Sequence, residues 1–226
     1  MWDALGSMLP YAVGLLVSPL PVAAVIMLLV SAGGVRKATV FETTWLIVSF
    51  ALVVAVAAVV RQTPPRTRGE TPVWEGVLVL VLGLVMLGIA VLVALAWSRQ
   101  RGQAGEIKAP AWLRALDSMS VMKIAVLAGV LIIANPVNAS MLIAAGVELG
   151  QHRLAVGRDL LPAALFTVIG SLTMVAPYAI TLAAGREAGF LPRARRWLLR
   201  HNNALTFWMT LAFGLLFLSK GLRALM

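Results

Sequence analysis

Long apolar runs, separated by short stretches that carry the charges, organise this sequence. Six runs contain no Asp, Glu, Lys or Arg: Ala4–Val35, Thr43–Val60, Gly76–Ser98, Ile124–Val147, Leu160–Gly185 and Asn202–Ser219. Because a membrane-spanning helix needs about 20 apolar residues, we interpret these runs as six transmembrane helices. The pattern predicts an all-α integral membrane protein with a single transmembrane domain over residues 1–226.

Composition and the missing motifs narrow the function classes. The 226 residues are 61% hydrophobic and only 12% charged, about half the charge of a soluble domain. This excludes a soluble globular enzyme and a disordered chain. The sequence has no cysteine, and neither a phosphate-binding loop nor a nucleophile elbow occurs in it. We therefore expect no enzyme activity, no cofactor and no metal site.

The basic residues predict the orientation in the membrane. The formal net charge is +10, and 12 of the 19 Lys and Arg residues lie in the first, third and fifth connecting stretches. The positive-inside rule places these stretches in the cytoplasm and both termini outside it. Because the charges sit in short loops, we expect membrane lipids as partners and no nucleic acid.

Two cytoplasmic stretches have helical patterns of their own. One follows Pro110 in the linker over residues 98–123, and the other follows Pro192, where Trp197 lies among several arginines. Both resemble short interfacial helices, with apolar faces in the headgroup layer and arginines near phosphates. Two interpretations stay open: ordinary positive-inside flanking sequence, or a landing site for a lipid substrate.

An internal repeat divides the chain into two halves. At an offset of 117 residues, the sequence Ser18-Pro19-Leu20-Pro21 aligns with Asn135-Pro136-Val137-Asn138, Gly33 with Gly150, Arg36 with Arg153 and Glu42 with Asp159. The repeats cover residues 8–97 and 124–222, with three predicted helices each. Three is an odd number, so equivalent elements face opposite sides of the membrane, as in the inverted repeats of transporters.

The prolines within the first and fourth runs predict two broken helices. Proline lacks a backbone donor and crowds the preceding turn, so Pro19 and Pro21 should break the first helix and Pro136 the fourth. Matched broken helices are a pointer to a substrate site at the membrane midplane. The predicted substrate-binding residues are Ser18, Pro19, Pro21, Asn135, Pro136, Asn138 and Ser140, with Thr167, Thr173 and Tyr178 from the polar fifth run. The alternative is a structural kink, with hydroxyls that bond their own backbone.

Four charged residues near the ends of the runs form a second hypothesis. Arg36 could pair with Glu42, and Arg153 with Asp159, as alternating gates on opposite sides of the membrane. The alternative is that all four are solvated interfacial charges. In the third run, Gly76, Gly83 and Gly88 indicate either close helix packing or a lipid-facing span.

The proline motifs and the loop after the first helix carry a family resemblance. Ser-Pro-Leu-Pro, then Gly33-Gly34-Val35-Arg36-Lys37, then Asn-Pro-Val-Asn in the fourth run resemble the GAP/Sap family of actinobacterial glycopeptidolipid- and sulfolipid-addressing proteins within the LysE exporter superfamily. The resemblance spans essentially the whole chain. It implies two inverted three-helix repeats, a bacterial inner-membrane location and the export of lipids or glycolipids. Membrane thiol shuttles of the DsbD/CcdA type are similar in architecture, but this chain lacks their cysteines.

Three functions remain in view. The leading one is a transporter of a lipid or amphipathic substrate, acting at the broken first and fourth helices. A small-solute exporter of the LysE type, for amino acids or cations, is the first alternative, and a non-transporting membrane scaffold for lipid export is the second. The near absence of charges from the centres of the runs favours the amphipathic substrate. A homodimer is a further expectation.

Overall fold

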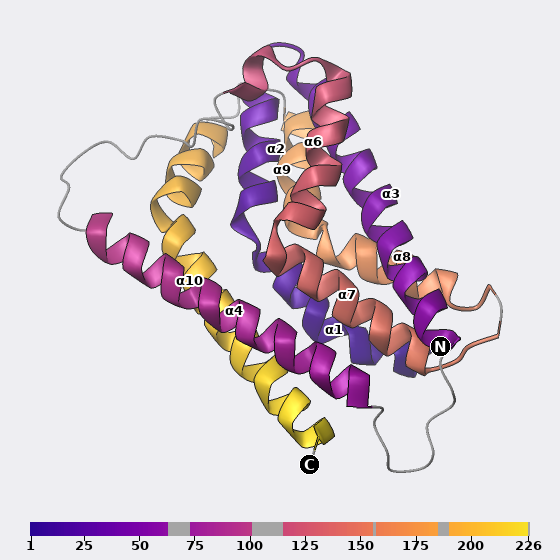
Figure 1. Cartoon of the computed structure of the whole chain (residues 1–226). Helices are drawn as coiled ribbons and strands as arrows, with labels where there is room; N and C mark the ends of the chain where they lie inside the picture. Colours follow the sequence, from indigo (N-terminus) through magenta and orange to yellow (C-terminus); the bar gives the residue numbers. More distant parts are fainter. Residues whose placement is uncertain (63–72, 101–114, 156, 185–189, 226) are drawn as a thin grey trace.

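The computed structural model describes residues 1–62, 73–100, 115–155, 157–184 and 190–225, and these form an assembly of helices (Figure 1). The helices are α1 (Trp2–Val17), α2 (Pro19–Val30), α3 (Gly34–Arg61), α4 (Val73–Gln100), the 3-10 helix η1 (Leu116–Ser118), α6 (Val121–Ala134), α7 (Pro136–Gln151), α8 (Leu160–Gly170), α9 (Leu172–Ala184) and α10 (Phe190–Leu225). The described residues contain no β-strand. The all-α prediction is confirmed.

Three spans are straight and three are bent pairs. Gly34–Arg61, Gly76–Ser98 and Arg200–Leu225 are each long and apolar enough to cross a membrane. The pairs α1/α2, α6/α7 and α8/α9 are bent by 50°, 73° and 64°. Counting each pair as one span gives six, in the order of the six apolar runs. In Figure 1, α2, α6 and α9 form the upper part of these pairs, and α1, α7 and α8 the lower part, next to both termini.

Proline chemistry explains two of the breaks. α1 ends at Val17, and α2 begins at Pro19 with Pro21 in the same turn, so two donors that a continuous helix would use are missing. The amide of Ser18 turns back to the Leu15 carbonyl, at 3.1 Å. α7 begins in the same way at Pro136. The predicted breaks in the first and fourth runs are confirmed.

The third break, at Ser171, was not predicted. The fifth run was expected to form one helix, but the chain bends between Gly170 and Leu172. Adjacent glycine and serine residues are a known cause of sharp kinks. Neither proline of this run causes the bend: Pro162 lies in the first turn of α8, and Pro177 lies inside α9.

The long helices α4 and α10 pack against each other as an antiparallel pair (Figure 1). A Cβ atom on Gly83 would come within 2.7 Å of the Leu218 amide, and one on Gly221 within 2.7 Å of the Leu80 amide. Of the two interpretations of the glycines in the third run, close packing holds for Gly76 and Gly83. It does not hold for Gly88, where a Cβ atom would meet nothing within 4 Å.

The expected separate interfacial helix after Pro192 is not found. Pro192 lies in the first turn of α10, which continues without interruption for 36 residues. Its basic first turns therefore continue directly into the last span. In the linker over residues 98–123, α4 extends to Gln100 and α6 begins at Val121. Residues 101–114 lie outside the described residues, and the described remainder of the stretch after Pro110 contains η1 and the start of α6.

The two halves share some features and differ in one. The breaks at Ser18 and Asn135 lie 117 residues apart, and α1 packs on α8 as α6 packs on α3. However, α3 is straight, whereas the corresponding α8/α9 pair is bent. The inverted repeat itself stays a prediction.

Candidate functional site

A cavity of about 470 Å³ lies between α2, α9 and α10, beside the first helix break. Apolar side chains make up most of its wall. The lining residues are Leu16, Val17, Ser18, Pro19, Val22 and Ile26 from α1 and α2, Thr173, Ala176, Pro177 and Ile180 from α9, and Ala194, Trp197, Leu198 and Leu205 from α10. The cavity can therefore hold an apolar group. Its hydroxyl groups, from Ser18 and Thr173, lie at one end.

The breaks of the first and fifth spans meet at this end of the cavity. The Thr173 hydroxyl donates a hydrogen bond of 2.8 Å to the Leu16 carbonyl oxygen. The last carbonyls of a helix lack partners within it, so this bond satisfies a group that the break leaves free. Gly170 packs so closely on α1 that a Cβ atom there would lie 2.9 Å from Leu15 Cδ1. The two bends are thus held together by direct contacts.

Only part of the predicted substrate site lines this cavity. Ser18, Pro19 and Thr173 do, whereas Pro21 is buried within α2. The cavity wall contains none of the predicted residues of the fourth run, which are Asn135, Pro136, Asn138 and Ser140. In this cavity, the first break therefore meets the fifth span. The sequence had suggested that the first break meets the break in the fourth span.

The two asparagines of the fourth run have different surroundings. Asn135 caps α7, because its Oδ1 accepts a hydrogen bond of 3.1 Å from the Val137 amide. Asn138 is 0% exposed, and neither its Nδ2 nor its Oδ1 atom has a partner among the described residues. Ser140, on the same helix, is buried. Asn135 thus has a structural role, while Asn138 is a buried polar group that the fold leaves unsatisfied.

Further unsatisfied polar groups lie on the buried face of α3, which packs on α7. Ser49 Oγ and Glu42 Oε1 are buried and have no hydrogen-bond partner in the described part of the chain. Gly146 of α7 packs on Val53, and Gly150 packs on Ala57, so the two helices run in the same direction.

Unsatisfied buried polar groups are rare and costly. Asn138 of α7 and Glu42 and Ser49 of α3 therefore form a second set of candidate residues, on two helices that pack on each other.

Two of the predicted hydroxyl residues form hydrogen bonds within or between helices and do not line the cavity. Thr167 donates to the Ala163 carbonyl of its own helix at 2.8 Å, as the alternative interpretation expected. The Tyr178 hydroxyl lies 2.7 Å from Thr39 Oγ1 and so joins α9 to α3.

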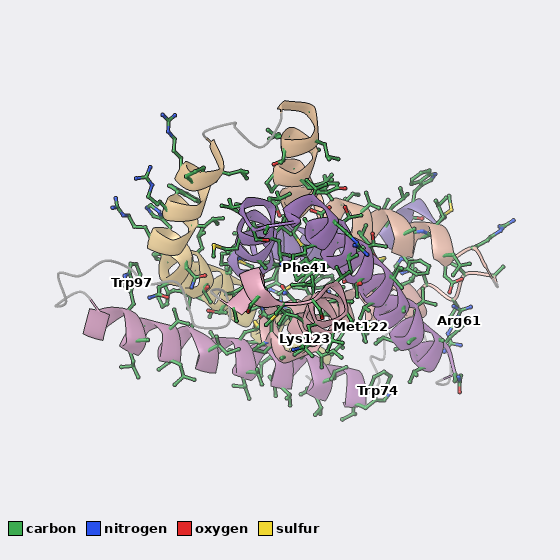
Figure 2. The ribbon with its side chains drawn as sticks, turned by 90° about the horizontal axis from the view of Figure 1, so that it is seen from above. Phe41, Arg61, Trp74, Trp97, Met122 and Lys123 are labelled. Atoms are coloured by element: carbon green, nitrogen blue, oxygen red, sulfur yellow. The ribbon has the colours of Figure 1, made fainter. Side chains whose placement is uncertain are left out.

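Neither of the predicted gate pairs is formed in this structure. Asp159 forms an ion pair with Arg61. The Arg153 guanidinium donates instead to the Arg61 carbonyl oxygen at 3.2 Å, from a turn in which Arg153 has a φ of 43°. Arg61 lies at the edge of the molecule in Figure 2.

The Arg36–Glu42 pair fails for a geometric reason. Arg36 is exposed and Glu42 is 7% exposed. Six residues apart on α3, the two point to different faces of the helix, because helical neighbours are three or four residues apart.

A polar cluster at the other end of α10 has no counterpart in the sequence interpretation. Lys220 Nζ donates to Glu148 Oε1 and, at 2.9 Å, to the Tyr11 hydroxyl. Tyr11 donates to the same Glu148 oxygen at 3.1 Å. The cluster ties α10 to α1 and α7. Glu148 is 72 residues from Lys220 and 137 residues from Tyr11 in the sequence. No local sequence pattern could therefore have revealed the cluster.

Comparison with known families supplies the broader context. A family model described as "Sap, sulfolipid-1-addressing protein" matches residues 8–223. Searches of curated proteins and of solved structures found no match. The match extends over all the helix breaks and the cavity, in a chain with the helices of a multi-pass membrane protein. The relation to LysE exporters and the actinobacterial source stay predictions. The chain belongs to the Sap family of sulfolipid-1-addressing proteins.

Proposed function

We propose that this protein moves a lipid or another amphipathic molecule across the bacterial inner membrane, with an acyl chain of the substrate held in the cavity between α2, α9 and α10. The observation that carries the proposal is the apolar wall of a 470 Å³ cavity placed directly at a helix break. Ligand cavities are commonly about 300–1,000 Å³ and mostly apolar. The family's description as lipid-addressing agrees with this substrate class.

The contact between the two breaks suggests how the cavity changes shape. α2 and α9 form opposite walls, and both begin at a break. The Thr173–Leu16 bond couples these breaks, so α2 and α9 would move together as segments hinged near Ser18 and Ser171. We propose that this movement opens the cavity toward the bilayer. The protein acts as a transporter and not as an enzyme, with loops one, three and five in the cytoplasm.

The cavity argues against a small-solute exporter. An amino acid or a cation would need polar or charged side chains to replace its water, and the wall offers only two hydroxyls, one of which is already bonded to Leu16. A scaffold without transport activity would have no use for an apolar cavity between hinged segments.

Transport by the purified protein in liposomes tests the proposal. The probe is a phospholipid with a fluorescent acyl chain, whose movement between leaflets is followed by chemical quenching from outside. The wild-type protein should accelerate this movement. Filling the cavity with Ala176→Trp or Ile26→Trp should reduce the rate at least tenfold.

A matched control separates cavity filling from general damage. Ile47→Trp adds a similar ring on α3, where the side chain is exposed to the surroundings, and should keep the wild-type rate. Each variant is checked for a single peak in size-exclusion chromatography. A wild-type protein that moves no lipid, or cavity variants as active as the control, would overturn the proposal.

A further inference from the structure

α10 is longer than a single membrane span requires. At 1.5 Å per residue, its 36 residues are about 54 Å long, against about 30 Å for the membrane core. The apolar span within it begins at Arg200. We therefore expect the preceding turns, from Phe190, at the membrane surface, and they also form part of the cavity wall.

These turns have one apolar face and one basic face. Ala194, Trp197 and Leu198 line the cavity. Arg193, Arg196 and Arg200 are exposed and follow one another at helical spacing along one stripe of α10. Figure 2 looks onto this end of the molecule and shows nitrogen-tipped side chains projecting outward from α10.

Trp197 marks the boundary between the two faces. At 100° per residue, Arg193 lies about 40°, Arg200 about 60° and Arg196 about 100° around the helix from Trp197, all on the side away from Leu198. The Trp197 side chain contacts the cavity yet remains 54% exposed, and the His201 ring stacks on it at 4.9 Å. Tryptophan in this setting favours the headgroup level of a membrane.

The charge of this segment has one sign. Residues 190–205 contain Arg193, Arg195, Arg196 and Arg200 and no Asp or Glu. A guanidinium binds a phosphate or sulfate through two parallel hydrogen bonds, which an exposed arginine beside an apolar cavity can offer to a lipid. Positive-inside flanking explains basic residues at this end of the molecule, but it does not require two of them to lie on either side of Trp197 along the helix, where Trp197 lines the cavity.

We propose that Arg193, Arg196 and Arg200, together with Trp197, bind the acidic headgroup of a lipid whose acyl chain occupies the cavity. This inference rests on the proposed function and adds the residues that select the headgroup, which would be a phosphate or sulfate ester. The stripe selects the headgroup, while the cavity accepts the chain without regard to headgroup charge.

Binding in detergent micelles tests the selection. The probes are phosphatidylglycerol and phosphatidylcholine with the same fluorescent chain, measured by fluorescence anisotropy. The wild-type protein should bind phosphatidylglycerol at least tenfold more tightly than phosphatidylcholine. The double variant Arg193→Gln/Arg196→Gln should bring this ratio close to one, with the affinity for phosphatidylcholine unchanged.

Two controls make the outcome specific. The double variant Arg36→Gln/Lys123→Gln removes the same charge from exposed positions that do not line the cavity and should keep the wild-type ratio. Excess glycerol phosphate, which has the charge but no chain, should not displace the lipid. An unchanged ratio in the Arg193/Arg196 variant, an equal loss in the control variant, or displacement by glycerol phosphate would each overturn the inference.

The same experiment separates this inference from the proposed function. If the wild-type protein binds both lipids equally and Ile26→Trp abolishes binding of both, the cavity is a lipid site and only the headgroup assignment fails. If the wild-type protein binds neither lipid, the proposed function fails as well.

Discussion

Thr173 of α9 donates a 2.8 Å hydrogen bond to the carbonyl oxygen of Leu16, next to the last residue of α1. One broken span thus supplies the hydrogen-bond partner that another broken span lacks. In a bilayer, water cannot substitute for such a partner, so the bond is part of what makes the break in the first span tolerable.

Replacing Thr173 with the similarly shaped valine should therefore destabilise the protein. Thr173→Val leaves the Leu16 carbonyl without its partner, at an expected cost of about 1–3 kcal/mol. Thermal unfolding in detergent measures the loss. Thr181→Val is the matched control on the same helix, because the Thr181 hydroxyl only bonds the Pro177 carbonyl one turn earlier. Equal losses in the two variants would contradict the role assigned to Thr173.

The two asparagines of the fourth run should respond in opposite directions. Asn138→Leu removes a buried amide without partners and should raise the free energy of unfolding by about 1–2 kcal/mol. Asn135→Ala removes the cap of α7 and should lower it by about 1 kcal/mol. Denaturation curves of both variants give the signs.

Transport by the Asn138→Leu variant shows whether the unsatisfied amide serves function. A buried polar group that lowers the stability of a protein is expected to serve its function. We therefore expect the more stable Asn138→Leu variant to move lipid several-fold more slowly than the wild-type protein. Wild-type transport would place Asn138 outside the working parts of the protein.

Asp159 should be energetically coupled to Arg61 and not to Arg153. Double-mutant cycles with Asp159→Asn, Arg61→Gln and Arg153→Gln compare the two pairs. The Asp159 side chain is nearly buried beside Arg61, so we expect a coupling energy of at least about 1 kcal/mol for that pair and below about 0.5 kcal/mol for Asp159 with Arg153. The reverse order would restore the gate pairing suggested by the repeat.

Two glycines of α4 should tolerate a methyl group very differently. Gly83→Ala places a Cβ atom 2.7 Å from the backbone of Leu218 and should force α4 and α10 apart, whereas a Cβ atom at Gly88 meets nothing. We expect a fall of several degrees in the unfolding temperature for Gly83→Ala, and no fall for Gly88→Ala, which gains helix propensity. Similar behaviour of both variants would argue against the tight α4/α10 contact.

Local chemistry explains which parts of the fold the sequence could predict. Apolar length predicts the spans. Pro19, Pro21 and Pro136 lack the backbone donor that a continuous helix needs, so the breaks at Ser18 and Asn135 were predictable, although Pro10 and Pro177 show that a helix can also continue through a proline. The break at Ser171 has no proline at the bend, and Gly170 packs there against Leu15, a contact between residues far apart in the chain.

Partners and cavities were harder to predict for the same reason. Asp159 follows Arg153 and Arg158 closely in the sequence, and nothing local points instead to Arg61, 98 residues away. The cavity is lined by apolar side chains such as Val22 and Ile180. In the sequence of a membrane protein, such residues cannot be distinguished from apolar residues that face lipid. Of the predicted site, Ser18, Pro19 and Thr173 were found at the cavity because breaks and hydroxyls are visible in the sequence, while the apolar wall is not.

The Tyr11–Glu148–Lys220 cluster gives α10 the mechanics of a lever. The cluster holds one end of the helix to α1 and α7, and Trp197 lies 23 residues, or about 35 Å, from this pivot. A tilt of about 5° at Lys220 would displace Trp197 by about 3 Å, enough to widen or narrow the mouth of the cavity. A substitution that removes the cluster would therefore change the width of a cavity about 35 Å along the helix from it.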